Sequence, residues 1–510
     1  MRVLFIYPNL FSQIGFNYGI AYISAFLKRK GHEVSLIHLN EKLGYVLDFE
    51  RIKRDIKRFS PDLVAFSIVT NQYRFALDLA SFIKKNFDIP IVCGGIHPTF
   101  AFSEILKTGV FDIVCRGEGE LFLAELLEKL EKNEDISNIR NLCMKNEEKI
   151  IVNKVRPYVD LNTLPMKDYE IFDFQKIINI KNGWVGILTS RGCPFKCSYC
   201  FNYPFRKIYE DDLGKRRGGI SSYLRRHKIE DVISEMIYLI SNYQNIKIFI
   251  FDDDIFTLDR EYLINFCKEY KKYIGLPFVC NCHVKFFDRE IALILKEAGC
   301  IIVKFGVESG NEFIRSKILK RKMKNSEIAK AFEIAKNVGL HTSAFLMIGL
   351  PKENIRRLKD TIKLIANIHP GRFRWSIFFP YPGTSIYEIA KEENLLKDEK
   401  KLYEYSNFFD KSPLDFGERQ NLYIDKLSKV FPWFVNAYSN FKVSEIYKNL
   451  VNFILKLDKS SWDSFKKDIK KLDETISNLL SLIDEEHYAI KYNDFMGVNS
   501  NWFNKEGKFY

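Results

Sequence analysis

Short apolar runs alternate with amphipathic stretches along the first part of the chain. The apolar runs predict β-strands at Val3–Tyr7, Glu33–His38, Leu63–Val69, Ile91–Cys93 and Ile113–Cys115. Apolar residues at helical spacing lie between them, as at Tyr22–Lys30 and Phe75–Lys85. Strands that alternate with helices form a parallel sheet covered on both faces. We therefore predict an α/β fold with a doubly wound parallel sheet over residues 1–135.

The same alternation returns over residues 181–397. Strands are predicted at Trp184–Thr189, Ile246–Phe251, Phe278–Cys282, Ile301–Phe305, Thr342–Ile348 and Arg374–Phe379. Helical patterns between them include Ile229–Tyr243, Arg260–Tyr273 and Glu290–Ala298. Six strand–helix units predict a partial (β/α)6 barrel of the TIM type, whose chemistry would sit at the carboxyl ends of the strands.

The two remaining regions have weaker patterns. Residues 136–180 mix charged residues with turn signals and are interpreted as a linker. Residues 398–510 are predicted to be mostly helical, because Leu422–Ala437 and Val443–Leu457 carry apolar residues at helical spacing. This last region fits either a helical cap that packs on the core or a lid that shapes a substrate pocket.

Glycine-rich loops follow two strands of the first region. Gly94-Gly95-Ile96-His97-Pro98-Thr99 follows the fourth strand, and Arg116-Gly117-Glu118-Gly119-Glu120 follows the fifth. Open parallel sheets bind ligands at the carboxyl ends of their strands, and glycine lets a ligand approach the backbone closely. Gly94, Gly95, His97, Thr99, Gly117 and Glu118 are therefore candidate cofactor-binding residues.

Three cysteines stand together in the loop after the first barrel strand. Cys193, Cys197 and Cys200 are separated by three and then two residues. Thiolates are the usual protein ligands of iron–sulfur clusters, and three of them leave one iron of a cubane open to a substrate or cofactor. A structural zinc site needs four closed ligands, which the neighbouring residues do not supply, and nothing marks the chain as a secreted, disulfide-bonded protein. We predict a reactive 4Fe–4S cluster.

Acidic residues follow two later barrel strands. Asp252, Asp253 and Asp254 follow the second strand, and Glu308 and Ser309 follow the fourth. Such side chains suit polar contacts with a bound cofactor. Solvated acids ahead of a helix cap at Asp259 and a polar turn are the alternatives.

Composition narrows the class of protein. The chain has 510 residues, of which 46% are hydrophobic, and a net charge of +13. It has no run of about 18 uncharged apolar residues, the minimum for a transmembrane helix, and its N-terminus lacks the features of a cleavable signal peptide. We expect a cytoplasmic protein. No stacking or base-reading motif accompanies its basic residues, so we do not expect nucleic-acid binding.

The cysteine loop resembles the Cys-x-x-x-Cys-x-aromatic-Cys motif of radical S-adenosylmethionine (SAM) enzymes. The resemblance implies that the three cysteines hold a 4Fe–4S cluster whose open iron binds SAM, and that the reduced cluster cleaves SAM to a 5′-deoxyadenosyl radical. It implies that Tyr199 lies near the adenine, that the Asp252–Asp254 run approaches the methionine amino group, and that Glu308 and Ser309 contact the ribose or amino acid.

The first region resembles the cobalamin-binding domain that precedes the barrel in one branch of these enzymes. The Gly-Gly-x-His-Pro-Thr and Gly-Glu-Gly-Glu elements carry this resemblance. The Asp-x-His-x-x-Gly loop that supplies a cobalt-ligating histidine in other cobalamin proteins is absent. The resemblance implies cobalamin as a third cofactor, without identifying a histidine ligand.

The leading hypothesis is cobalamin-dependent methylation of an unactivated carbon. One alternative is cyclisation or oxidative rearrangement without methyl transfer, as in the anaerobic magnesium-protoporphyrin ester cyclase of the same branch. Another is a non-catalytic iron–sulfur sensor of redox state or SAM. The expected partners are a small-molecule or lipid-like substrate and an external electron donor such as flavodoxin or ferredoxin.

Overall fold

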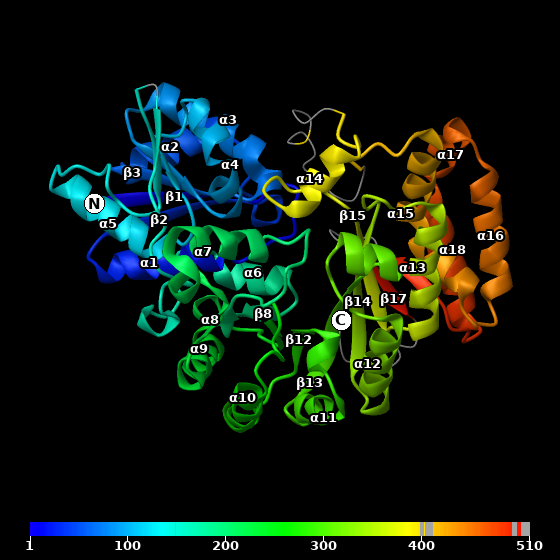
Figure 1. Ribbon diagram of the computed structural model, residues 1–510. Coiled ribbons are helices and arrows are strands. Elements are labelled where there is room, and N and C mark those ends of the chain that lie inside the picture. Colours follow the sequence, from blue (N-terminus) through cyan, green and yellow to red (C-terminus); the bar gives the residue numbers. More distant parts are fainter. Residues whose placement is uncertain (148, 398–401, 403–411, 492–496, 501–510) are drawn as a thin grey trace.

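An N-terminal sheet domain, a partial barrel and a C-terminal helical region follow one another along the chain (Figure 1). The computed structural model describes residues 1–147, 149–397, 402, 412–491 and 497–500. In the view of Figure 1 the sheet domain lies at the upper left, and the helical region covers the far side of the barrel.

The N-terminal sheet has the strand order β2-β1-β3-β4-β5-β6-β7. Its five parallel strands are β1 (Arg2–Pro8), β2 (Glu33–Leu39), β3 (Leu63–Ser67), β4 (Ile91–Gly94) and β5 (Ile113–Cys115). The helices around it are α1 (Tyr18–Arg29), α2 (Phe49–Phe59), α3 (Tyr73–Asn86), α4 (Ile96–Lys107) and α5 (Glu120–Glu131), with 3-10 turns at Glu41–Leu43 and Thr70–Gln72. Val3 and Phe5 pack into one core while Leu4 and Ile6 pack into another. Both sheet faces are thus buried, which explains why these strands are continuous apolar runs.

The region interpreted as a linker contributes to this sheet. Strands β6 (Leu142–Asn146) and β7 (Lys149–Val152) form a hairpin that pairs antiparallel with β5. Its sequence mixes polar and apolar residues because the hairpin lies at the sheet edge: Cys143 is buried, whereas Lys145 and Lys149 are exposed. The 3-10 turn Leu161–Thr163 and helix α6 (Phe174–Ile180) then lead to the barrel.

Six parallel strands form the partial barrel. They are β8 (Trp184–Ile187), β11 (Ile248–Phe251), β12 (Phe278–Cys282), β13 (Cys300–Glu308), β14 (His341–Ile348) and β15 (Arg372–Ile377). The outer helices are α9 (Ile229–Asn242), α10 (Arg260–Tyr273), α11 (Arg289–Glu297), α12 (Asn325–Asn337) and α13 (Ile355–Ile368). Asp259 accepts a hydrogen bond from Tyr262 N at 3.0 Å and so caps α10. The predicted fold class is confirmed.

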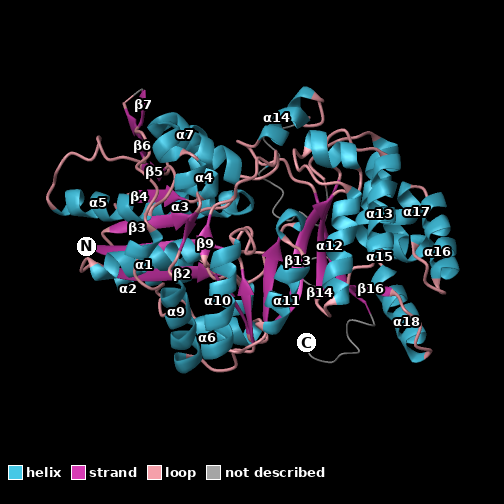
Figure 2. Ribbon diagram, turned by 60° about the horizontal axis from the view of Figure 1, so that its bottom comes forward, coloured by secondary structure: helices cyan, strands magenta, loops and turns pink. Residues whose placement is uncertain are grey.

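Several short elements decorate the barrel. They are α7 (Asn202–Gly218), α8 (Ile220–Tyr223), α14 (Ser385–Glu392), the paired strands β9 (Ser190–Arg191) and β10 (Arg225–Arg226), the 3-10 turn Val284–Phe286 and the π-helical turn Ile314–Ile318. Helix α7 lies beside the sheet domain (Figure 2), and both α7 and α8 supply residues that line the cavities described below.

The C-terminal region packs on the last part of the barrel. Its helices are α15 (Glu418–Tyr438), α16 (Ser444–Lys456), α17 (Lys459–Phe465) and α18 (Ile469–Leu482). Trp375 on β15 donates a hydrogen bond to Ser428 O on α15 at 2.8 Å. Strands β16 (Tyr488–Lys491) and β17 (Gly497–Ser500), which the helical prediction for this region did not include, extend the barrel sheet antiparallel beyond β15. Within the described ranges, none of the helices has the length and apolar character needed to cross a membrane.

Candidate functional site

The three motif cysteines line one cavity of about 370 Å³ at the carboxyl end of the barrel strands. Gly192 begins the loop with a φ of +106°, and a Cβ there would lie 2.6 Å from Tyr223 O. Ser198 fixes the middle of the loop, since its N and Oγ donate to Leu319 O and Ile318 O at 3.0 and 2.6 Å. Glycine and short polar side chains therefore hold the loop against the barrel rim.

The cysteines fit an iron–sulfur cluster by chemistry and placement. Burial raises the pKa of Cys193 to about 12 and that of Cys200 to about 11, which keeps both thiols protonated in the absence of metal. Metal binding releases these protons and gives thiolates. Arg321 Nη1 lies 3.9 Å from the sulfur of Cys197 and favours its thiolate. Among the described residues, no three candidate ligands gather tightly enough for a single metal ion.

Tyr199 and Glu308 meet on one wall of this cavity. Tyr199 donates a hydrogen bond to Glu308 Oε1 at 3.1 Å. Burial raises the pKa of the Glu308 carboxyl group, and the nearby cation of Arg321 partly offsets this increase. Its φ of +65° is rare for a residue other than glycine, and such strain is most often retained at functional sites. Arg321, which also donates to Gly306 O at 3.0 Å, had no motif to reveal it in the sequence.

The three aspartates after β11 line the same cavity but have different partners. Asp252 accepts a hydrogen bond from Tyr18 at 2.8 Å. Asp253 is fully buried and accepts from Thr189 N at 3.1 Å and Thr189 Oγ1 at 2.7 Å, which ties β11 to the start of the cluster loop. Asp254 accepts from Asn202 Nδ2 at 2.9 Å. Asp253 thus stabilises the start of the cluster loop. Asp252 and Asp254 also line a neighbouring cavity, which is described below.

Ser309 is not among the residues that line the cavity. It is fully buried, with its Oγ 3.4 Å from Thr361 Oγ1 on α13. Because Glu308 turns inward, its neighbour turns outward to the helix layer. The hydroxyl of Ser309 thus faces α13, and its predicted contact with SAM stays a prediction.

A second cavity of about 340 Å³ lies at the carboxyl edge of the N-terminal sheet. The sequence-predicted residues Gly94, Gly95, Gly117 and Glu118 line it. Gly95 has a φ of +106°, and a Cβ there would lie 2.8 Å from Ile68 O. A cradle of glycine backbone and apolar side chains fits a large, flat cofactor such as cobalamin. Of the described residues that line it, none is a histidine.

His97 and Thr99 lie behind this cavity. His97 is buried against Tyr73, with ring centroids 4.5 Å apart, and burial lowers its pKa to about 3. Thr99 donates to Gly95 O at 2.8 Å and accepts from Gly117 N at 3.1 Å, so it joins the two glycine loops. Neither side chain lines the cavity, because α4 begins at Ile96 and carries both residues into the helix layer. Thr99 thus supports the two loops, and ligand contact by His97 or Thr99 stays a prediction.

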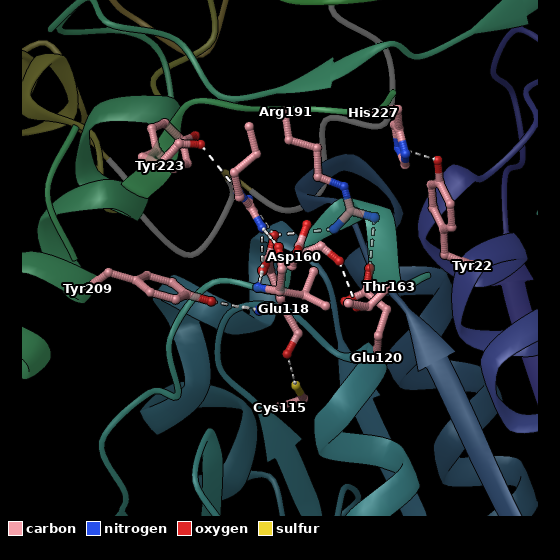
Figure 3. Close-up of polar contacts among 12 residues, drawn as sticks. Tyr22, Cys115, Glu118, Glu120, Asp160, Thr163, Arg191, Tyr209, Tyr223 and His227 are labelled. Carbon is pink, nitrogen blue, oxygen red and sulfur yellow. Dashed lines mark hydrogen bonds and ion pairs between the residues drawn. The ribbon is translucent and has the colours of Figure 1, made fainter. Parts of the chain in front are cut away.

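Glu118 connects the sheet domain to the barrel (Figure 3). Its carboxylate pairs with Arg225 at 2.7 Å and with Arg191 at 3.2 Å, and it accepts from Val159 N at 2.9 Å. Burial alone would raise the pKa of Glu118, but the two arginines lower it below its ordinary value. Arg191 reaches Glu120 as well, at 2.7 Å (Figure 3). Glu118 lies at the cavity edge, yet its oxygens serve mainly to hold the two domains together.

A third cavity of about 660 Å³ lies between these two. It shares the lining residues Tyr18, Glu118, Leu188 and Arg191 with the sheet-edge cavity, and Tyr199, Cys200, Asn202, Asp252 and Asp254 with the cysteine cavity. Tyr18 reaches Asp252 over Gly186, where a Cβ would lie 2.2 Å from the tyrosine oxygen. The three cavities are therefore neighbours, and the 660 Å³ cavity borders both of the others.

Two family models match the chain, one in the N-terminal sheet domain and one in the barrel. The model of the B12 binding domain matches residues 10–127, and that of the radical SAM superfamily matches residues 187–365. An uncharacterized methyltransferase of Pyrococcus horikoshii is 31% identical over 407 residues, which are 78% of this chain and 84% of the relative. The chain belongs to the radical SAM enzymes that carry a cobalamin-binding domain. The anaerobic magnesium-protoporphyrin IX monomethyl ester cyclase of Rubrivivax gelatinosus is 26% identical, covering 82% of this chain and 75% of its own.

Solved structures share the fold of this family member. The radical SAM methyltransferase TsrM from Kitasatospora setae aligns with a TM-score of 0.61 and 19% identity, over 77% of this chain and 76% of its own. The cobalamin-dependent SAM radical enzyme OxsB aligns with a TM-score of 0.59 and 16% identity, over 79% of this chain and 56% of its own. The chain is thus a radical SAM enzyme, and the cofactors of its two domains are a 4Fe–4S cluster, SAM and cobalamin. This assignment favours an enzyme over the predicted sensor alternative.

Proposed function

We propose that the chain is a cobalamin-dependent methyltransferase that acts on an unactivated carbon. The observation that carries this proposal is the cavity between the cysteine loop and the glycine loops, which shares lining residues with the cavities at both of them. A substrate in the middle cavity can contact both cofactor sites without moving between domains. The similarity to a methyltransferase over most of both chains supports it.

The cofactors supply the difficult chemistry, namely radical formation and methyl transfer, and the protein positions them and excludes water. Cys193, Cys197 and Cys200 would hold the cluster. Tyr199 and Glu308 offer an aromatic face and a carboxylate to SAM, while Asn202, at 3.5 Å from the sulfur of Cys200, orients the last cysteine. Gly94, Gly95 and Gly117 would bring backbone against cobalamin.

Tyr18 has a position of its own in this arrangement. It lines the sheet-edge cavity and the middle cavity, and its hydroxyl donates to Asp252, which lines the cysteine cavity. We assign Tyr18 and Asp252 the role of fixing the boundary between the cofactor sites. An external donor such as flavodoxin or ferredoxin stays the predicted source of electrons.

The test is product analysis on protein purified without oxygen and reconstituted with iron, sulfide and hydroxocobalamin. With SAM, reductant and candidate substrates, we expect 5′-deoxyadenosine, S-adenosylhomocysteine and a methylated product together. A Cys193→Ala variant is the matched control and should yield none of them.

A second candidate is cyclisation or oxidative rearrangement without methyl transfer, because the cyclase of Rubrivivax gelatinosus is similar over most of both chains. 5′-Deoxyadenosine and a new ring or oxidised product, with no S-adenosylhomocysteine, would replace the methylation proposal by this one.

A further inference from the structure

The inner face of the barrel carries a group of basic side chains on β13, β15 and β16. Phe305 on β13 and Phe373 on β15 belong to the core on the helix side of the sheet. Because successive residues of a strand point to opposite faces, Lys304, Arg372 and Arg374 face the barrel interior. Ile490 on β16 packs on the helix side in the same way, so Lys491 faces inward as well.

Strand register brings these residues into neighbouring rows. Lys304 pairs with Ser343, which pairs with Arg372, so two strand spacings of about 4.8 Å each separate the first and last of them. Arg374 pairs with Gly497, and Gly497 pairs with Lys491. The side chains of lysine and arginine are long enough to reach a common ligand across such distances.

Of these basic residues, Lys304 is the one that lines the cavity of the candidate site. It lines the cavity that also contains Cys193, Cys197 and Cys200. In the part of the chain that the structure describes, its Nζ has no hydrogen bond or ion pair. The carboxylates in that cavity have donors of their own, from Tyr18 for Asp252 and from Tyr199 for Glu308.

The electrostatic surroundings of Lys304 favour an additional anion. The pKa of Lys304 is lowered to about 8, chiefly by burial; the cations of Arg372 and Arg374 also lower it, and Asp252 opposes them. A buried ammonium group is costly unless it is paired and hydrogen-bonded. Lys181, which follows α6, is a second lysine that interacts with Asp252, and burial lowers its pKa too.

We propose that the inner face around Lys304 is the binding site for an oxyanion of the substrate, a carboxylate or a phosphate-type group. This inference rests on the proposed function and adds the chemical class of its substrate. Lys304 contacts the oxyanion from within the cysteine cavity, and the charges of Arg372 and Arg374 add long-range attraction. The substrate then extends from this deep end toward the middle cavity.

Lys304 lies apart from the residues that are predicted to contact SAM, so oxyanion binding there is distinct from SAM binding. Lys304 pairs with Ser343 and Glu308 with Leu346, so they lie three residues apart along β14, about 10 Å at the usual rise. Arg321 is the cation that stands beside Glu308, Tyr199 and Cys197. The group at Lys304 therefore serves a ligand that lies deeper in the barrel.

Calorimetric titration of the full chain tests the proposal. The protein carries its oxidised cluster and cobalamin and is saturated with SAM, which fills the open iron without being cleaved. Inorganic phosphate and acetate are the probes, and we expect at least one of them to bind. Which one binds distinguishes a phosphate-type from a carboxylate substrate.

The decisive comparison uses Lys304→Met against Lys330→Met, which removes the same charge from an exposed position on α12. We expect Lys304→Met to weaken anion binding about tenfold or more, because hydrogen bonds to charged groups are stronger than neutral ones, and Lys330→Met to leave it unchanged. The iron content of each variant shows whether its barrel still holds the cluster. If Lys304→Met loses iron, Lys304→Gln is used for the same titration.

Three results would overturn the proposal. The first is a wild-type protein that binds neither anion. The second is a Lys304→Met protein that binds the anion as tightly as wild type. The third is a Lys304→Met protein that loses affinity for SAM and not for the anion. No turnover is needed. An enzyme that cleaves SAM without methylating anything would therefore contradict the proposed function and leave the oxyanion site intact.

Discussion

Individual residues at the site divide into those that face the cavities and those that support them. Cys193, Cys197 and Cys200 face one cavity, whereas Ser309 and His97 were candidates by sequence but lie in the helix layers. Their neighbours in the chain are site residues, and adjacent residues at a strand or helix end point in different directions. Sequence proximity to a motif was therefore a good guide to the neighbourhood of the site and a poor guide to side-chain direction.

The cluster assignment makes a prediction at this scale. Cys200→Ala should remove nearly all of the roughly four irons expected for a cubane, because a cluster with two remaining thiolates is poorly held. Cys282→Ala is the matched control, since Cys282 lines the same cavity but lies on β12 outside the motif. Iron analysis and EPR of the reduced protein measure both. Equal iron loss in the two variants would contradict the assignment.

Among the structural elements, the loop after β14 is organised by one carboxyl group. Glu353 Oε2 accepts hydrogen bonds from Gly349 N at 2.8 Å and Leu350 N at 3.1 Å. The side chain is buried, and burial raises its pKa from 4.5 to about 8. The loop thus depends on an acid that stays protonated in the folded protein near neutral pH.

This raised pKa predicts a pH dependence of stability. Between pH 4.5 and about 8 the folded state holds a proton that the unfolded state has released. The free energy of unfolding should therefore fall as pH rises through this window, by up to about 1.4 kcal/mol per pH unit. Glu353→Gln keeps an oxygen acceptor but cannot ionise, so its melting temperature should fall less between pH 5.5 and 8.

Thermal melting of wild type, Glu353→Gln and Glu297→Gln at both pH values checks this expectation. Glu297 is an exposed carboxylate at the end of α11 and serves as the control that should keep the wild-type slope. A Glu353→Gln protein with the wild-type slope would show that another group is responsible.

At the scale of the whole molecule, the cavities exist only because two domains are held in one arrangement. Glu118 from the sheet domain binds Arg191 and Arg225, which belong to the paired strands β9 and β10 beside the cluster loop (Figure 3). Lys167, ahead of α6, pairs with Glu235 on α9 at 2.6 Å, and both side chains are buried. Domain position is thus fixed by buried charges as well as by apolar packing.

Removal of the Glu118 carboxylate should loosen this arrangement. Glu118→Gln removes the anion of Arg225 and leaves Arg191 with Glu120 alone. Breaking a buried ion pair typically costs about 3 kcal/mol or more. We expect a lower melting temperature and weaker cobalamin retention on gel filtration. Glu290→Gln breaks an exposed pair with Arg260 and should cost less than about 1 kcal/mol. Similar effects of the two changes would show that Glu118 does not hold the domains together.

The sequence by itself determined the strands, the order of the elements, the cysteine loop and the glycine loops. These features are local: apolar periodicity and motif spacing are properties of neighbouring residues, and the six barrel strands and the fold class followed from them. The sequence did not predict the hairpin β6–β7 or the strands β16 and β17, because each is only four or five residues long and mixes polar with apolar residues.

Only the tertiary structure decided which distant residues meet. Tyr18 reaches Asp252 across 234 positions of the chain, and Glu118 reaches Arg225 across 107. The inward row of Lys304 and Arg372 depends on the register of three strands. Isolated tyrosines, lysines and arginines carry no motif, and their roles arise from strand pairing and domain contact, which bring together charges that sequence spacing does not relate.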